Sequence, residues 1–247
     1  MPVFRKNGKN ILFIHVPKCG GTSIENAFRD SGYVTEYLDR KLGQKSMNHL
    51  RTCSPQHMHA AQLEEIFRLD RFDLVFMVVR DPVARFRSEY VYKHRKEKTV
   101  SRRGDVVSAW ARKQFRAYES NPYVLDNHLR PQHEFWMPAA RVYRLEDGID
   151  EMLSDLNRRF EIGVTAGGRA LNSKKEAGFS SSEVEMPDEL TEFVCDFYRD
   201  DFTRFGYTPR QAPVQATVPF ADGNVGGPST LKRLKRKARS VASKIKR

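Results

Sequence analysis

Residues 11–23 read Ile11-Leu12-Phe13-Ile14-His15-Val16-Pro17-Lys18-Cys19-Gly20-Gly21-Thr22-Ser23, an apolar run followed by a turn and the start of a helical pattern. The apolar run predicts a buried strand. The two adjacent glycines allow a tight turn whose N–H groups can face an anion, and the following helix adds unpaired N–H donors and its positive dipole end. Lys18 contributes a point charge, and Thr22 and Ser23 contribute hydroxyl groups. The stretch therefore predicts an anion-binding loop between a strand and a helix.

The order of these residues separates the loop from two other kinds of phosphate loop. In a Walker loop the lysine follows the last glycine and a hydroxyl holds magnesium, whereas Lys18 precedes both glycines. A phosphatase-type loop with Cys19 as nucleophile would need an arginine about six residues on, where Glu25 would instead repel an anion. The sequence thus disfavours a nucleoside triphosphatase and a cysteine phosphatase. A glycine turn that merely joins strand to helix stays the alternative.

A second apolar run, residues 74–79, ends in Arg80-Asp81-Pro82. A continuous apolar run is typical of a parallel strand that is covered on both faces. Arg80 would then stand at the carboxyl end of this strand. Asp81 can cap a helix, and Pro82 suits the first helical position. The sequence predicts a helix from Pro82 onward.

The first stretch resembles the 5′-phosphosulfate loop of sulfotransferases that use 3′-phosphoadenosine 5′-phosphosulfate (PAPS). The pattern is similar to that of carbohydrate sulfotransferases related to the heparan sulfate 2-O- and 6-O-sulfotransferases, sulfotransferase family 2, which usually carry threonine in place of Cys19. The resemblance covers residues 11–207 and implies that the 5′ end of PAPS is bound by Lys18, Cys19, Gly20, Gly21, Thr22 and Ser23. It also implies that Arg80 and Ser88 bind the 3′-phosphate, a role that suits the two-pronged guanidinium of arginine.

Two later segments resemble parts of the same family. Residues 171–175 are similar to a loop that folds over the 3′-phosphate, which implies donor contacts for Asn172, Ser173 and Lys174. Residues 126–133 are similar to a segment beside the active site, which implies acceptor or sulfonate contacts for His128, Arg130 and Gln132. An acidic sugar would match Arg130. For residues 171–175 the alternative is a solvated run of lysines. For residues 126–133 the alternative is a loop whose side chains only pack against the domain.

Residues 56–63 lie between the two anion motifs and contain His57 and His59. An alcohol must lose its proton as its oxygen attacks sulfur, and a neutral imidazole can accept that proton near pH 7. The segment is similar to the histidine stretch of the heparan sulfotransferases, and alignment on the following helix favours His59 as the base and leaves His57 as an acceptor contact. A helix-start histidine without a catalytic role and a His-x-His zinc site are the alternatives. No metal is expected, because the neighbouring residues lack metal-ligand spacing.

Composition and pattern indicate the fold class. The 247 residues, 39% hydrophobic and 11% aromatic, fit one packed domain. Strand-like runs at residues 11–16, 74–79 and 141–146 each lead into a helical pattern. We therefore expect an α/β fold similar to P-loop proteins, with a central parallel sheet of about four or five strands and helices on both faces. The anion loops should gather at the carboxyl ends of the strands.

The three cysteines, Cys19, Cys53 and Cys195, are an odd number without framework spacing, which favours a reducing compartment. No run is long enough for a membrane span, and residues 1–10 are too short and polar for a signal peptide. These features predict a location in a bacterial-type cytoplasm, with a peripheral position at the inner membrane face as an alternative.

Most of the net charge of +12 lies at the end of the chain. Residues 231–247 hold nine Lys/Arg and no acid, so the remaining 34 basic and 31 acidic residues give only +3. We expect a sulfotransferase domain over residues 1–208, a Pro/Gly linker over 209–230 and a basic tail over 231–247. The apolar residues of the tail recur at three and four positions, typical of a helix on an anionic bilayer. A disordered tail is the alternative, and nucleic acid is not expected as a partner.

The expected activity is transfer of a sulfuryl group from PAPS to a hydroxyl of a polysaccharide or glycolipid. His59 would take the hydroxyl proton, and Lys18 would stabilise the charge on the bridging oxygen of the donor. The co-product would be adenosine 3′,5′-bisphosphate, and no metal would take part. Two alternatives stay open: a nucleotide or metabolite kinase, which the missing Walker order disfavours, and a non-catalytic binder of nucleic acid or membrane acting through its tail.

Overall fold

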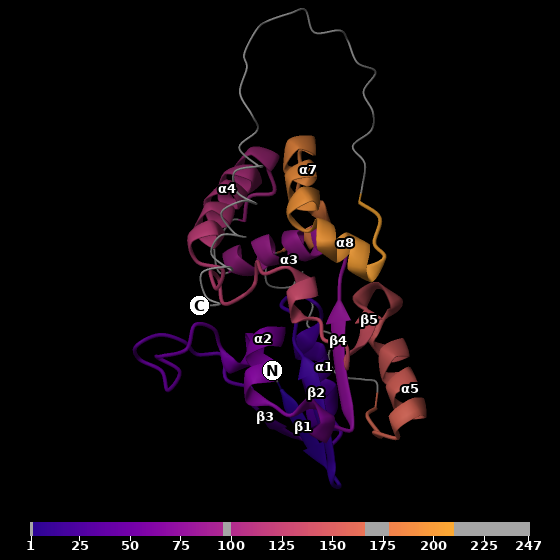
Figure 1. Cartoon of the computed structure of the whole chain (residues 1–247). Helices are drawn as coiled ribbons and strands as arrows, with labels where there is room; N and C mark the ends of the chain where they lie inside the picture. The colour runs from indigo at the N-terminus through magenta and orange to yellow at the C-terminus, as the bar shows by residue number, and fades with distance from the viewer. Residues whose placement is uncertain (1, 96–99, 166–177, 210–247) are drawn as a thin grey trace, which may run out of the picture. The chain divides into compact units, whose positions relative to one another are not determined.

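The computed structural model describes residues 2–95, 100–165 and 178–209 (Figure 1). The chain divides into two units, Met1–Ala212 and Pro213–Arg247. The second unit lies outside the described residues, and so do the predicted basic tail and the predicted linker from residue 210 onward. The description below therefore concerns the first unit.

The centre of this unit is a five-stranded sheet in the order β3-β1-β2-β4-β5 (Figure 1). Its strands are β1 (Val3–Lys6), β2 (Lys9–Ile14), β3 (Val34–Glu36), β4 (Leu74–Val79) and β5 (Arg141–Arg144). β2 pairs in parallel with β4, and β4 in parallel with β5, whereas β1 is antiparallel to both of its neighbours. The predicted α/β class with a parallel core is confirmed, and the sheet is mixed because of β1.

β1 and β2 form a hairpin that the sequence analysis did not anticipate. The turn between them is Asn7-Gly8, and both residues have positive φ, 51° and 79°. These are the values and the residue pair of a type I′ turn, whose twist matches that of the two strands it joins. The hairpin adds an edge to the sheet without a crossover helix, so it does not show as strand–helix alternation in the sequence.

Helices follow the three parallel strands in the predicted way. α1 follows β2, α3 follows β4 and α5 follows β5. The helices are α1 (Gly21–Asp30), α2 (Ala60–Ile66), α3 (Pro82–His94), α4 (Gly104–Ser120), α5 (Ile149–Phe160), α7 (Asp188–Phe197) and α8 (Arg199–Phe205). Short 3-10 turns are η1 (Pro55–His57), η2 (Leu69–Arg71), η3 (Gln132–Phe135), η4 (Leu145–Asp147) and η5 (Ser181–Glu183). Within the described residues, every helix is too short or too polar to cross a bilayer.

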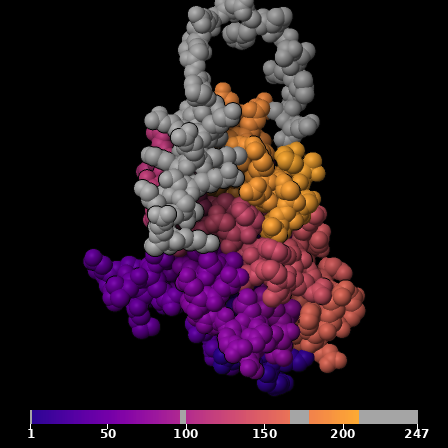
Figure 2. Space-filling view, in the orientation of Figure 1, coloured from indigo at the N-terminus to yellow at the C-terminus, as the bar shows by residue number. Residues whose placement is uncertain are grey.

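A long loop connects β3 to η1. Figure 2 shows this segment as a purple projection from the surface of the first unit. The same segment leads directly into the predicted histidine stretch.

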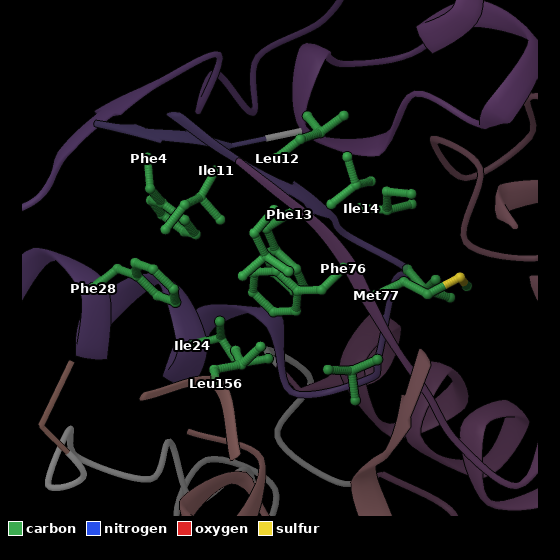
Figure 3. Packing of buried hydrophobic residues seen from close by; sticks show 14 of the residues in the cluster. Phe4, Ile11, Leu12, Phe13, Ile14, Ile24, Phe28, Phe76, Met77 and Leu156 are labelled. Carbon is green, nitrogen blue, oxygen red and sulfur yellow. The ribbon is translucent and has the colours of Figure 1, made fainter. Parts of the chain in front are cut away.

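The core lies on both faces of the sheet. On one face the rings of Phe4 and Phe28 stack 4.0 Å apart, and those of Phe13 and Phe76 lie 4.9 Å apart (Figure 3). The alternate residue Leu12 points to the opposite face, and it belongs to the same buried cluster as Leu63 of α2. Helices therefore cover both faces, as a parallel core requires.

A second buried cluster joins α3, α4 and α7, through residues such as Phe86, Phe115 and Val194. This cluster matters for the site because it fixes α3, the helix that begins at the end of β4. Asp81 caps α3 as predicted, since its side chain accepts a hydrogen bond from the N–H of Ala84 at 2.8 Å. Because β2 and β4 are parallel neighbours, the loop after β2 and the start of α3 meet at one edge of the sheet.

Candidate functional site

The loop after β2 presents backbone donors. Lys18 and Gly20 both have left-handed φ, 68° and 81°, and Gly20 is the N-cap of α1. The N–H groups of Gly21 and Thr22 have no acceptor among the described residues, and no side chain caps the helix. Unpaired N–H groups at a helix N-terminus form an anion site. Thr22 and Ser23 stand half-exposed in the same first turn.

Both glycines are required by the packing beneath the loop. A Cβ on Gly21 would lie 2.1 Å from Nε2 of His15, and a Cβ on Gly20 would lie 2.9 Å from Cδ1 of Leu145. The chain at Gly20 also adopts a φ that side chains disfavour. The glycine pair thus lets the turn sit directly on the buried His15 ring.

Lys18 is held by α3 in a positively charged corner. Its ammonium lies 3.8 Å from the centre of the Tyr92 ring, which also carries the guanidinium of Arg95 at 3.7 Å. Burial lowers the pKa of Lys18 to about 8, and the carboxylate of Glu89 opposes that shift. Arg80 donates from Nη1 to the Lys18 carbonyl at 3.4 Å. The structure therefore brings Lys18 and Arg80 together as predicted, and it adds Arg95.

Arg85 of α3 braces this corner. Its buried guanidinium donates to the carbonyl of Pro17 at 3.0 Å, to that of His128 at 2.8 Å and to that of Arg130 at 2.9 Å. One side chain thus ties the anion loop to the distant segment 126–133. The sequence analysis missed Arg85 and Glu89, although both lie on the same stripe of α3 as the core residues Phe86 and Tyr90. Charged residues on the buried stripe of a helix are the signal that would have found them.

His57 is a buried, oriented imidazole. Its Nδ1 lies 2.7 Å from Oδ2 of Asp126, and Asp126 also accepts from the N–H and hydroxyl of Ser54. Because a carboxylate only accepts, Nδ1 carries the proton and Nε2 keeps its lone pair. Burial lowers the pKa of His57 to about 4 against the effect of Asp126. His57 is therefore neutral at pH 7.

His128 continues the polar chain toward Lys18. Its ring lies 4.8 Å from that of His57, and its Nδ1 lies 2.5 Å from Oε2 of Glu89. The Tyr92 ring stacks on His128 at 5.5 Å. Burial lowers the pKa of His128 and raises that of Glu89. The result is a buried row of side chains that runs from Asp126 to the Lys18 corner.

His59 occupies a separate position at the N-cap of α2. Its Nδ1 lies 2.8 Å from Oε1 of Gln62, which also accepts the backbone N–H of His59 at 3.3 Å. The backbone donor fixes the orientation of the amide, so Nδ1 carries the proton and Nε2 is the acceptor. The His59 ring lies 5.9 Å from that of Tyr123, whose ring also carries the Arg130 guanidinium at 4.9 Å. Burial, with a smaller effect from Arg130, lowers the pKa of His59.

The described contacts therefore join His59 to Arg130 through Tyr123, and they do not join it to Lys18. Arg130 is itself buried, and it donates to Asn127 at 2.9 Å and to Glu134. The roles expected for His57, His59, His128 and Arg130 stay predictions. The structure supplies their positions.

Cys19 and Gln132 turn inward. The Cys19 thiol is buried and donates to Oε1 of Gln132 at 3.3 Å, and burial raises its pKa to about 12. A protonated thiol is a poor nucleophile, so only the backbone of Cys19 can serve the loop. Gln132 is fully buried, with Oε1 also accepting from the N–H of Arg80 and Nε2 donating to the Arg80 carbonyl. The amide of Gln132 is thus hydrogen-bonded to the end of β4, and its expected contact with substrate stays a prediction.

Glu25 also faces away from the loop. Its carboxylate is buried, 2.7 Å from Nδ1 of His15 and 2.9 Å from Nη2 of Arg40, and Gln56 donates to it at 3.0 Å. This group supports the floor beneath Gly21. Its charge is matched by Arg40, so it does not oppose an anion at the loop as strongly as the sequence position suggests.

Of the other residues predicted to contact PAPS, the structure describes only Ser88. Ser88 lies half-exposed on α3, eight residues after Arg80. Asn172, Ser173 and Lys174 lie outside the described residues.

One group could offer metal ligands. Potential ligand atoms of His57, Asp126 and His128 lie within 4.8 Å of one another. However, Nδ1 of each histidine is already paired with a carboxylate, and Asp126 already accepts from Ser54. This is the geometry of oriented imidazoles, in which a metal could reach only the Nε2 atoms without breaking those bonds. The absence of a metal stays a prediction.

The fold and the site define an α/β protein with a candidate anion-binding site at the carboxyl ends of parallel strands. The model of the sulfotransferase family matches residues 2–208. The chain belongs to the sulfotransferase family, which confirms the family resemblance seen in the sequence and supports sulfuryl transfer as its chemistry. Searches of the curated proteins and of the solved structures gave no significant match.

Proposed function

We propose that this protein transfers a sulfuryl group from PAPS to a hydroxyl group of a glycan, either a polysaccharide or a glycolipid. The observation that carries the proposal is the meeting of two anion-binding elements. The unpaired N–H groups of α1 stand beside Lys18, and Arg80 from the end of β4 reaches the same loop at 3.4 Å. A nucleotide with phosphate groups at both ends of its ribose fits such a pair of positions.

The residues present fit this donor. Lys18, the N–H groups of Gly20, Gly21 and Thr22 and the hydroxyls of Thr22 and Ser23 would hold its phosphosulfate, and Arg80 with Ser88 would hold its 3′-phosphate. Asn172, Ser173 and Lys174 are proposed to contribute to the same end. Beneath the loop the buried side chains of His15, Glu25 and Gln56 are in hydrogen-bond contact with one another. A preorganised cradle of this kind lowers the cost of placing the reacting groups.

The reaction exchanges one bond to sulfur for another. The acceptor oxygen forms a bond to sulfur while the bond between sulfur and the bridging phosphate oxygen breaks, and the hydroxyl proton moves to Nε2 of His59. The ammonium of Lys18 stabilises the charge that grows on the departing phosphate oxygen. Arg130, beside His59, would contact an acidic sugar. His57 and His128 would line the acceptor side as neutral hydrogen-bonding groups.

Two measurements on four variants test these roles. Labelled PAPS with fractionated glycans measures turnover, and calorimetry with adenosine 3′,5′-bisphosphate measures donor-site binding. Lys18→Ala should abolish turnover and weaken nucleotide binding, whereas His59→Ala should abolish turnover and leave nucleotide binding unchanged. Lys113→Ala removes an exposed cation on α4 and is the matched control. His57→Ala tests whether the second imidazole is the base.

The proposal fails if no glycan fraction is labelled, or if His59→Ala and Lys18→Ala weaken nucleotide binding equally. Retained turnover in His59→Ala together with loss in His57→Ala would move the base to His57. If ATP with magnesium stabilised the protein against heat better than the bisphosphate does, a kinase would replace the sulfotransferase.

A further inference from the structure

A basic apolar loop, defined here as residues 38–52, projects between β3 and η1 (Figures 1 and 2). It carries four exposed cations, Arg40, Lys41, Lys45 and Arg51, of which Arg40 is paired with Glu25, and one acidic residue, Asp39. From residue 40 to residue 63 the sequence contains no aspartate or glutamate. The loop is therefore a local concentration of positive charge on a domain whose remaining excess is small.

Two aliphatic side chains at the end of this loop point into water. Met47 is 92% exposed and Leu50 is 88% exposed, the highest values among the large hydrophobic side chains of the described residues. Side chains of this size usually lie against the protein. Here they stand among cations instead, which is the composition of a surface that enters an interface between water and lipid.

The exposure is a consequence of ordered local structure. Nδ2 of Asn48 donates to Oδ2 of Asp39 at 2.6 Å and to the carbonyl of Lys41 at 3.1 Å, and the N–H of Lys41 donates to Oδ1 of Asp39 at 2.9 Å. The N–H of Ser46 donates to the carbonyl of Gly43. These bonds close residues 39–48 into a ring. Asn48 points into this ring, while the neighbouring Met47 is turned out.

The base of the loop is fixed to the floor of the candidate site. Arg40 donates to Glu25 at 2.9 Å, and Arg51 contacts the sulfur of Met58 at 3.5 Å. A partner that engages the loop tip therefore binds a rigid projection of the domain, so little ordering is needed on binding.

We propose that the basic apolar loop docks the protein onto an anionic lipid bilayer, with Met47 and Leu50 entering the headgroup boundary and the surrounding cations facing anionic lipids. A soluble acidic polysaccharide would satisfy the cations but leave both aliphatic side chains in water, so the bilayer is the partner that matches the whole surface. This contact is separate from the one proposed for the tail.

The test uses the full chain with Met47→Trp and vesicles whose acyl chains are brominated. Bromine quenches only tryptophans that enter the lipid. We expect roughly two-fold loss of the emission of the added tryptophan on vesicles that contain phosphatidylglycerol, and none on pure phosphatidylcholine. Val106→Trp, at an exposed position on α4, is the matched control and should give no quenching beyond that of the native tryptophans.

Charge variants made in the Met47→Trp protein test which cations attract the anionic lipid. Lys41→Gln with Lys45→Gln should shift the quenching to several-fold higher lipid concentration, whereas Arg112→Gln with Lys113→Gln, an equal loss of exposed charge on α4, should not. Three results would each overturn the proposal. They are no vesicle binding, vesicle binding without added quenching at position 47, and equal effects of the two charge pairs. If a soluble acidic polysaccharide shifted the emission of the tryptophan introduced by Met47→Trp and vesicles did not, the polysaccharide would be the partner of the loop instead.

Discussion

Lys18 combines burial with two neighbouring arginines, and at the scale of single residues this makes its charge sensitive to pH just above neutrality. Its pKa lies at about 8, so it loses its proton as the pH rises through that value. The pKa of His59 is lowered, so His59 stays neutral to a pH below its usual range. Turnover by the proposed mechanism needs Lys18 charged and His59 neutral.

We therefore predict a bell-shaped dependence of kcat/KM on pH, with an acid limb below pH 6.5 and an alkaline limb near pH 8. The bound anionic donor favours charged Lys18, so the alkaline limb of kcat should lie higher than that of kcat/KM. Lys18→Arg, which keeps its charge, should lack the alkaline limb. Steady-state rates across pH check this, and an unchanged limb in Lys18→Arg would assign it to another group.

Gly21 is the second residue with a sharp expectation. Its Cβ position is 2.1 Å from the His15 ring, which is itself held by Glu25 and Gln56. Gly21→Ala must displace the ring or lift the loop, with a cost of about 1–3 kcal/mol. We predict a matching loss of stability in urea unfolding and weaker binding of adenosine 3′,5′-bisphosphate. Glu119→Ala, at an exposed position on α4, is the control and should change neither quantity. Unchanged nucleotide binding in Gly21→Ala would contradict this account.

At the scale of elements, α3 connects the two halves of the site. Its first residues follow Arg80, the proposed ligand of the 3′-phosphate, its middle carries Arg85 and Glu89, and the ring of Tyr92 near its end contacts Lys18. The three buried carbonyls bound by Arg85 belong to segments far apart in the chain. One helix thus sets the spacing between donor loop and acceptor side.

Arg85→Met should leave those carbonyls without donors. We predict a loss of about 3–5 kcal/mol in the free energy of unfolding, measured with urea, because removing one partner of a buried charged network is costly. Arg112→Met on α4 removes an exposed arginine and should change stability by less than about 0.5 kcal/mol. If both variants lost the same small amount, the brace would not be a major source of stability.

The elements that the sequence could predict are those with a strong local pattern. The runs that became β2 and β4 are continuous and apolar, and Asp81-Pro82 marks a helix start by its own chemistry. β1 and β3, with four and three residues, are too short for a periodic signal. Near the end of the described chain α7 and α8 are separate helices with Tyr198 between them, a break that no glycine or proline in the sequence marks.

The hydrogen bonds between distant residues of the site could not be predicted from the sequence. Asp126 holds His57 across 69 positions in the chain, and Gln132 reaches Arg80 across 52. Such pairs depend on which loops the sheet order brings together, and no spacing in one sequence encodes that. Resemblance to a family supplied candidate positions in the segment 126–133. It did not show that Gln132 faces inward.

At the scale of the whole molecule, charge is divided between two units. The unit Met1–Ala212 contains both buried clusters and the complete set of described site residues. The last 17 residues carry nine of the 43 basic residues. We propose that this tail adds a second attraction to anionic lipid and contributes little to the fold.

Ending the chain after Ala212 tests this division. The truncated protein should keep its thermal unfolding midpoint and its affinity for adenosine 3′,5′-bisphosphate, because the packing and the anion loop lie in the first unit. It should need more anionic lipid to pellet with vesicles, yet quenching at Met47→Trp should persist, since the basic apolar loop is retained. Loss of nucleotide binding on truncation would mean that residues beyond 212 take part in the site, and loss of all quenching would make the tail the sole membrane contact.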